Sequence, residues 1–292
     1  MKLGDICSAP CFARASEFII PAAGCSQNEL EFGHEDGRRY FAVLLRNHDI
    51  RRSVAFNPKV AIVGLSPAGT QIDAFVDTYR NSGYYGTASI AGAFAGLAPD
   101  IIKMLKGLGI ADKLDLAFPA PTLDMHPDVY VTSLVACASL TTNGSSDDFD
   151  PTLVPAARRC MVDRFASEML NPDFKRLSHI LILGAKGWSA IKSVRMSDNL
   201  SLLEHLQKQG KRVFNLPHPS GQNREYVNLA SLPAEHAPTR DNYVSEKWVE
   251  YLLKPPKEGK PKQAEGKYRN RRETVWRTID ELRQEIASME AI

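Results

Sequence analysis

His218 is the side chain whose position most clearly indicates chemistry. It follows an apolar run at residues 212–217 that is typical of a buried β-strand, and it opens the polar turn His218-Pro219-Ser220-Gly221. A second loop rich in glycine and proline, at residues 64–71, also follows an apolar run. Ligands of open α/β sheets bind outside the carboxyl ends of the strands. An imidazole at such a place can donate a hydrogen bond to negative charge that develops during a reaction.

Four apolar, β-branched runs predict the strands that carry these loops. Segments with helical spacing of apolar residues lie between them, and this alternation predicts an α/β fold with a parallel sheet. The predicted strands are residues 59–65, 128–136, 179–184 and 212–217, and the predicted helices include 98–110 and 154–170.

The ends of the chain differ from this core, which is assigned to residues 58–252. Residues 1–57 have cysteines and turns without a strand-helix-strand pattern, and they are expected to form an extension packed on the core. Residues 253–272 are rich in Lys and Arg and are expected to be a basic flexible linker. Residues 273–292 predict an amphipathic helix that either folds back on the domain or meets a partner. Its apolar face consists of Val275, Ile279, Leu282 and Ile286.

Composition excludes several classes of protein. The 292 residues are 43% hydrophobic and 24% charged, as in a globular protein with a sizeable core. No apolar run approaches the roughly 20 residues of a membrane helix, and the first residues lack the apolar region of a signal peptide. We therefore expect a cytoplasmic protein. Neither a phosphate-binding G-x-x-x-x-G-K-(S/T) motif nor a convincing dinucleotide motif occurs.

The ordered set of motifs resembles the uracil-DNA glycosylase superfamily. "GLSPAG" at 64–69 and "HPSGQNR" at 218–224 are similar to its two signature motifs, and "DVYVTSLVACASL" at 128–140 looks like its second core strand. The resemblance covers about residues 7–232. It implies a three-layer αβα sandwich around a central four-stranded, mostly parallel sheet. It also implies an enzyme that flips a nucleotide out of DNA and hydrolyses the bond between base and deoxyribose.

The resemblance assigns a role to the second motif loop. His218 would donate a hydrogen bond to the departing base. Arg224 would enter the minor groove and fill the space that the flipped base leaves. The predicted DNA-binding residues are Pro219, Ser220, Gly221, Gln222, Asn223 and Arg224.

The first loop departs from the family pattern. Many relatives have Asp or Asn where this chain has Ser66, and serine alone is a poor general base. Gln71 and Asp73 are nearby candidates for holding the attacking water, although Asp73 could equally cap a helix. We predict Ser66 and Asp73 as catalytic residues beside His218, and substrate contacts from Gly64, Leu65, Pro67, Ala68 and Gln71.

Base recognition also departs from the pattern. Ser133 stands where uracil-specific relatives have an Asn, and a hydroxyl cannot form the paired hydrogen bonds of an amide. Some superfamily members excise heavily modified phage cytosines as a defence. The resemblance and this substitution together therefore imply a modified pyrimidine as the target, such as a glucosylated hydroxymethylcytosine of phage DNA. Tyr84 or Tyr85 would stack on the flipped base, and Tyr85 is favoured.

The cysteines match branches of the family that carry a 4Fe–4S cluster. Cys7, Cys11, Cys137 and Cys160 occupy the corresponding places, and Cys25 is a spare thiol that could replace one of them. Such a cluster would be structural, because hydrolysis needs no electron transfer. The alternative is a set of unconnected buried thiols.

The predicted function is therefore a monomeric, monofunctional DNA glycosylase that needs no cofactor for catalysis. Two alternatives stay open. One is a uracil-excising repair enzyme. The other is a catalytically inactive DNA-binding module that senses a modified base.

Overall fold

The computed structural model describes residues 2–5, 7, 17–22, 24–35, 37–48, 56–67, 69–141, 149–254 and 263–289. Two compact units make up the chain. The first consists of Met1–Ala98 and Thr122–His218, and the second of Pro99–Pro121 and Pro219–Ile292. Every described strand belongs to the first unit. No helix in the described ranges is long and apolar enough to cross a membrane.

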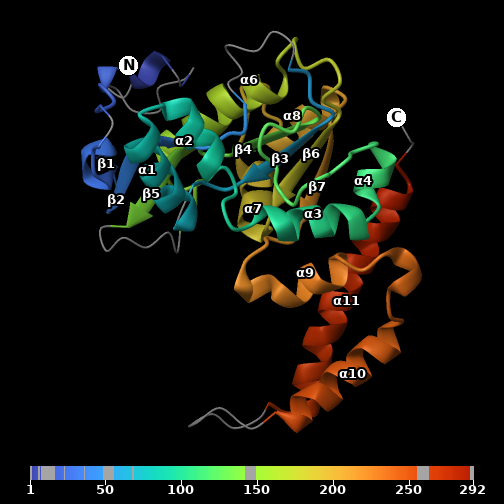
Figure 1. The fold of residues 1–292 in the computed structure, drawn as a ribbon. Helices are drawn as coiled ribbons and strands as arrows, with labels where there is room; N and C mark the ends of the chain where they lie inside the picture. Colours follow the sequence, from blue (N-terminus) through green and yellow to red (C-terminus); the bar gives the residue numbers. More distant parts are fainter. Residues whose placement is uncertain are drawn as a thin grey trace. The chain divides into compact units, whose positions relative to one another are not determined.

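The central sheet of the first unit is fully parallel, with the strand order β4-β3-β6-β7 (Figure 1). Each predicted apolar run supplies one strand, so the α/β prediction is confirmed. Runs of this kind suit a parallel sheet because both of its faces are buried. The bounds are β3 Val60–Gly64, β4 Val129–Ser133, β6 His179–Leu183 and β7 Arg212–Leu216.

The register sets the carboxyl ends of these strands level with one another. Gly64 pairs with Ser133, Val63 pairs with Ile182, and Leu183 pairs with Leu216. The chain leaves β3 for β4 on one side and returns to β6 on the other, so the order reverses between β3 and β6. A ligand of an open α/β sheet is expected at this switch point.

A second, antiparallel sheet joins the amino-terminal residues to the core. It has the order β1-β2-β5, with β1 at Glu31–Glu35, β2 at Arg38–Leu44 and β5 at Cys137–Thr141. The predicted strand 128–136 therefore ends at Ser133, and the chain passes through 134–136 into this second sheet. The extension 1–57 contributes β1 and β2.

Helices flank the central sheet and connect its strands. α7 packs against β6, and α8 packs against β7. The predicted helix 154–170 is present, but its middle third is a π-helix. The first-unit helices are α1 Thr70–Ser82, α2 Tyr85–Gly92, α5 Pro155–Arg159, the π-helix Cys160–Phe165, α6 Ala166–Met169, α7 Ala185–Ser193 and α8 Leu202–Lys208, with short 3₁₀ helices at Leu3–Asp5 and Gln27–Leu30.

The second unit is built from helices in its described residues. α10 and α11 form a hairpin, and α11 also packs on α9 (Figure 1). The predicted apolar face of α11, from Val275 to Ile286, is buried. The bounds are α3 Ala98–Gly107, α4 Ile110–Lys113, α9 Arg224–Ala230, α10 Arg240–Leu253 and α11 Glu265–Ala287, with 3₁₀ turns at Gly221–Asn223 and Ala234–His236.

The predicted linker 253–272 is shorter than expected. α11 begins at Glu265, so the last part of that segment is helical, while residues 255–262 lie outside the described residues. Tyr268 explains the difference, because it is buried and its ring stacks on Tyr251 of α10 with centroids 4.3 Å apart. One aromatic contact thus stabilises a segment whose composition indicates only charge.

His179 of β6 gives the fold a sensitivity to acid. Its side chain is 1% exposed, and burial lowers its pKa from the ordinary 6.5 to about 4. The unfolded chain therefore binds a proton first as pH falls below about 6.5. The free energy of unfolding should be nearly constant above about pH 7.5 and fall by about 2.5 kcal/mol between pH 6.5 and 4. Urea unfolding across this range measures the effect.

A His179→Phe variant is the control, because a phenyl ring can keep the contact with Phe214 and cannot titrate. The two rings are nearly parallel, with centroids 6.2 Å apart. His48 and His218 add to the wild-type trend, since burial lowers both pKa values. An equally steep pH dependence in the variant would contradict the assignment to His179.

Candidate functional site

His218 lies two residues beyond β7 and packs on the turn that follows β6. Gly184 forms that turn with φ +87°, and its N–H donates to the Leu216 carbonyl at 2.7 Å. A Cβ added to Gly184 would lie 2.9 Å from the Cβ of His218. Only glycine permits this backbone angle without strain and leaves room for the histidine.

The His218 imidazole is suited to donate a hydrogen bond. Burial lowers its pKa below the ordinary 6.5, so the ring is neutral at neutral pH and carries one N–H. Its ring nitrogens bind no other group in the described part of the chain. The sequence predicted this residue, and the structure places it just beyond the carboxyl end of the sheet.

Gly64 and Ser133 lie beside an aromatic ring at the carboxyl end of the same sheet. A Cβ at Gly64 would lie 3.2 Å from the Phe94 ring and 3.5 Å from Ser133 Oγ. Phe94 is 3% exposed and has φ 54°, a left-handed angle that is rare for an aromatic residue. Strain of this kind concentrates at functional positions. The sequence analysis missed Phe94, because no motif or spacing marks it.

Tyr85 has a structural role in this arrangement. It is 8% exposed, its hydroxyl donates to the Ala42 carbonyl at 2.7 Å, and it accepts from the Leu44 N–H at 3.0 Å. Its ring packs edge-on against Phe75 with centroids 4.9 Å apart. These contacts argue against the predicted stacking role. Tyr84 is 73% exposed.

Ser66 ties the first loop to the second sheet. Its hydroxyl donates its one proton to the Cys137 carbonyl at 3.2 Å, so towards a further group the Ser66 oxygen can only accept a hydrogen bond. The Leu65 carbonyl accepts from the Val135 N–H at 2.9 Å, and Pro67 is buried. The loop is therefore held mainly by backbone groups. Ala68, also a predicted substrate contact, lies outside the described residues.

Gln71 and Asp73 begin α1. The helix is capped by Gly69, whose φ is 51°, so Asp73 is not its cap. The Asp73 side chain is exposed, and the structure describes no contact between it and His218. Gln71 is half-buried. The main-chain carbonyl oxygen of Gln71 would lie 2.9 Å from a Cβ at Gly92, where α1 packs closely on α2.

Arg164 binds the main chain at the carboxyl end of β4. It lies in the π-helix and is 2% exposed. Its Nη2 donates to the carbonyls of Ser133 and Leu134, and its Nη1 donates to Glu168 at 2.6 Å. Since Leu134 also donates to the Gly64 carbonyl at 2.8 Å, the arginine supports the backbone of both site strands. The sequence analysis missed it, because one arginine in an amphipathic helix looks like a surface residue.

Three of the predicted cluster ligands are buried thiols that influence one another. Burial raises the pKa of Cys137, and Cys7 and Cys160 raise it further. Cys160 Sγ accepts from Arg164 Nε at 3.3 Å. No group of three metal-binding side chains is close enough for an ion within the described ranges. The fourth predicted ligand, Cys11, lies outside them. The described thiols therefore fit a cluster only in part.

The predicted DNA-binding loop opens the second unit. Pro219 is buried, and Asn223 bonds back to Ser220 through its side-chain amide at 3.3 Å and its N–H at 3.0 Å. Gly221 and Gln222 are exposed between them. Arg224 is 57% exposed and forms an ion pair with Asp100 of α3. The loop is thus braced internally, and its arginine already has an anionic partner.

A family model decides what this arrangement represents. The model of the uracil DNA glycosylase superfamily matches residues 52–244, which include both motif loops and the whole parallel sheet. The chain belongs to the uracil DNA glycosylase superfamily. No curated protein and no solved structure matched the chain in the corresponding searches.

Membership of the uracil DNA glycosylase superfamily indicates a glycosylase-type function on DNA. The matched range includes His218, Gly64 and Ser133. The match leaves β1, β2 and α11 outside.

Proposed function

We propose that the chain is a monomeric, monofunctional DNA glycosylase that removes a non-standard base and leaves an abasic site. The observation that carries the proposal is the neutral imidazole of His218, without a protein partner in the described residues, on the close turn at Gly184. A preorganised donor aimed at developing charge accelerates a reaction, because it needs no rearrangement.

In the proposed reaction the bond between C1′ of the deoxyribose and the base nitrogen breaks. The bonding electrons leave with the base, and the N–H of His218 stabilises the charge on it. The oxygen of a water molecule bonds to C1′ and releases a proton to solvent. Phe94, rather than Tyr85, is proposed to stack on the flipped base, a contact worth ~1–3 kcal/mol.

We propose a modified pyrimidine as the target. Ser133 is 6% exposed and is the polar side chain at the Gly64 edge. A single hydroxyl supplies less pairing to uracil than an amide, and its small size leaves space for a substituent. A glucosylated hydroxymethylcytosine of phage DNA fits this description, and its removal would be a defence activity.

Base release from a panel of duplexes tests the proposal. The panel contains uracil, hypoxanthine, hydroxymethylcytosine and glucosylated hydroxymethylcytosine, and alkali cleavage detects abasic sites. Release of the bulky base alone is expected. Release of uracil alone would replace the proposed target with a repair substrate.

An inactive module that senses a modified base is the second candidate. Ser66 favours it, because serine alone is a poor general base and its one hydroxyl proton is already donated to the Cys137 carbonyl. Tight binding of a modified duplex without release of any base in the panel would establish this alternative.

We further propose that Cys7, Cys11, Cys137 and Cys160 hold a structural 4Fe–4S cluster. Cys7, Cys137 and Cys160 are buried free thiols, and Cys7 and Cys160 lie near enough to Cys137 to raise its pKa. The cluster would stabilise the fold and take no part in hydrolysis. Iron and acid-labile sulfide analysis of the purified protein tests it.

A further inference from the structure

The chain concentrates positive charge beyond the family-matched residues. Residues 254–272 contain eight Lys and Arg against two Glu, a net charge of +6. The whole chain carries +2, so the remaining residues carry −4. The family match ends at residue 244, and the glycosylase reaction does not account for this segment.

Several cations of the α10–α11 hairpin have no acidic partner among the described residues, although their neighbours do. Arg269 pairs with Glu265 at 2.7 Å, and Lys247 pairs with Glu250 at 3.0 Å. By contrast, Lys254, Lys267 and Arg271 are exposed and form no ion pair within the described ranges. Lys267 and Arg271 are one helical turn apart on α11, so they share a face.

An aromatic cluster packs the first turns of α11 against α10. Tyr268 stacks on Tyr251, and its ring centroid is 5.6 Å from that of Trp248. The Tyr268 hydroxyl donates to the Lys247 carbonyl at 3.0 Å. These contacts hold the amino-terminal turns of α11 against α10, so the exposed cations stand on an ordered surface.

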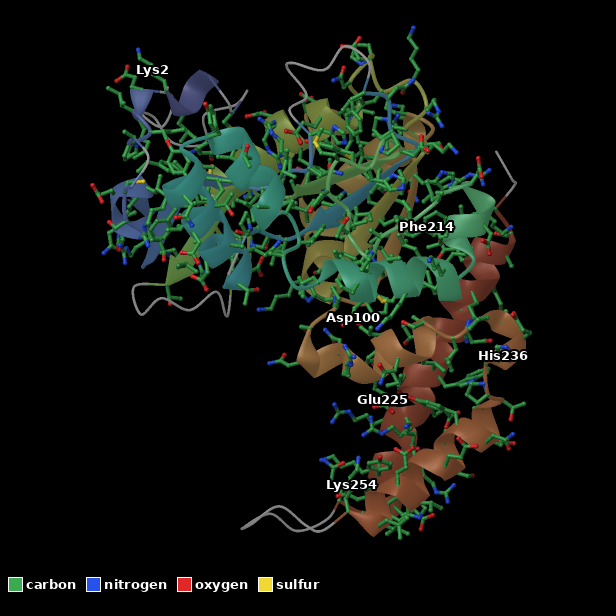
Figure 2. The ribbon with its side chains drawn as sticks, viewed as in Figure 1. Lys2, Asp100, Phe214, Glu225, His236 and Lys254 are labelled. Carbon is green, nitrogen blue, oxygen red and sulfur yellow. The ribbon has the colours of Figure 1, made fainter. Side chains whose placement is uncertain are left out.

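Glu225 connects the hairpin to the predicted DNA-binding loop. It pairs with Arg272 of α11 and accepts from the Tyr243 hydroxyl at 2.6 Å. Glu225 directly follows Arg224, the last residue of that loop. Figure 2 shows Glu225 at α9 and Lys254 at the far end of α10. Lys267 is five residues from Arg272, about 7.5 Å along the helix axis.

We propose that the α10–α11 hairpin is a second DNA-binding element that contacts the phosphate backbone of duplex DNA beside the 219–224 loop. The choice of DNA as the partner rests on the proposed function. Unpaired cations on a firm surface match a regular array of phosphates, and such contacts are independent of sequence. The hairpin would add phosphate contacts to those of the 219–224 loop.

The test removes two cations from the hairpin and two from elsewhere. Lys267→Gln/Arg271→Gln is compared with Lys175→Gln/Lys208→Gln, which lie at exposed positions shortly before β6 and β7. Binding to an unmodified duplex of about 25 base pairs is measured by fluorescence anisotropy at several salt concentrations.

The hairpin variant is expected to bind on the order of 10-fold more weakly near 0.1 M salt, because it loses two phosphate contacts. Each lost contact should also reduce the slope of log K against log salt by about 0.9. Its slope should fall by about 2 in total, and that of the control by much less. Equal slopes in the two variants would overturn the proposal. The duplex contains no target base, so this result is independent of whether the chain releases any base.

Discussion

Replacing His218 with alanine is expected to lower the single-turnover rate of base release by about 10²–10³-fold. The variant removes the neutral imidazole N–H that lies beyond the carboxyl end of β7, beside Gly184. The binding of DNA should change little, because the lost interaction forms with charge that exists only in the transition state. Rates are measured with excess enzyme on the duplex that the panel identifies.

His236→Ala is the matched control, since His236 is an exposed histidine in a short 3₁₀ turn (Figure 2). It should leave the rate unchanged. A His218→Ala enzyme that keeps its rate within a few-fold would remove this residue from the mechanism. A large loss of DNA binding in the same variant would make it a binding residue instead.

The second large effect is expected from Arg164→Met. The side chain is 2% exposed, and its removal takes the shortest ion-pair partner from Glu168, which is 10% exposed, and takes the Arg164 donors from the Ser133 and Leu134 carbonyls. Breaking a buried ion pair in this way costs about 3–5 kcal/mol in the free energy of unfolding. Urea unfolding measures the loss.

Two further variants separate the causes. Glu168→Gln in the Arg164→Met background removes the uncompensated charge and should restore part of the stability. Arg158→Met, at an exposed position on α5, should have an effect within about 0.5 kcal/mol. If Arg164→Met lost no more stability than Arg158→Met, the network would not support β4 as described.

The strands and both motif loops could be predicted because their signals are local. Buried parallel strands require continuous apolar runs, and the loops after 59–65 and 212–217 follow directly from them. The burial of Val275, Ile279, Leu282 and Ile286 followed equally from spacing alone. The contact between Gly184 and His218 could not be predicted in this way, because nothing local in the sequence connects the two residues.

The remaining site residues could not be predicted, because long-range contacts define them. Phe94 reaches Gly64 from thirty positions along the chain, and its strained φ has no signature in residue type. Tyr85 is predicted from the place where relatives have a stacking aromatic residue, whereas its hydroxyl binds the backbone of β2. The guanidinium of Arg164 donates to groups that lie either about thirty residues away in the sequence or one helical turn away, so no local pattern marks it.

The pairing of β2 with β5 has a consequence for producing this protein in pieces. A fragment limited to the family-matched residues 52–244 would keep β5 and lose β2. The N–H and C=O groups of β5 that now bond to β2 would form an open edge, and such edges recruit other chains. The Tyr85 hydroxyl would also lose both backbone partners. A recombinant domain that does not aggregate therefore has to include the amino-terminal strands, which lie outside the family match.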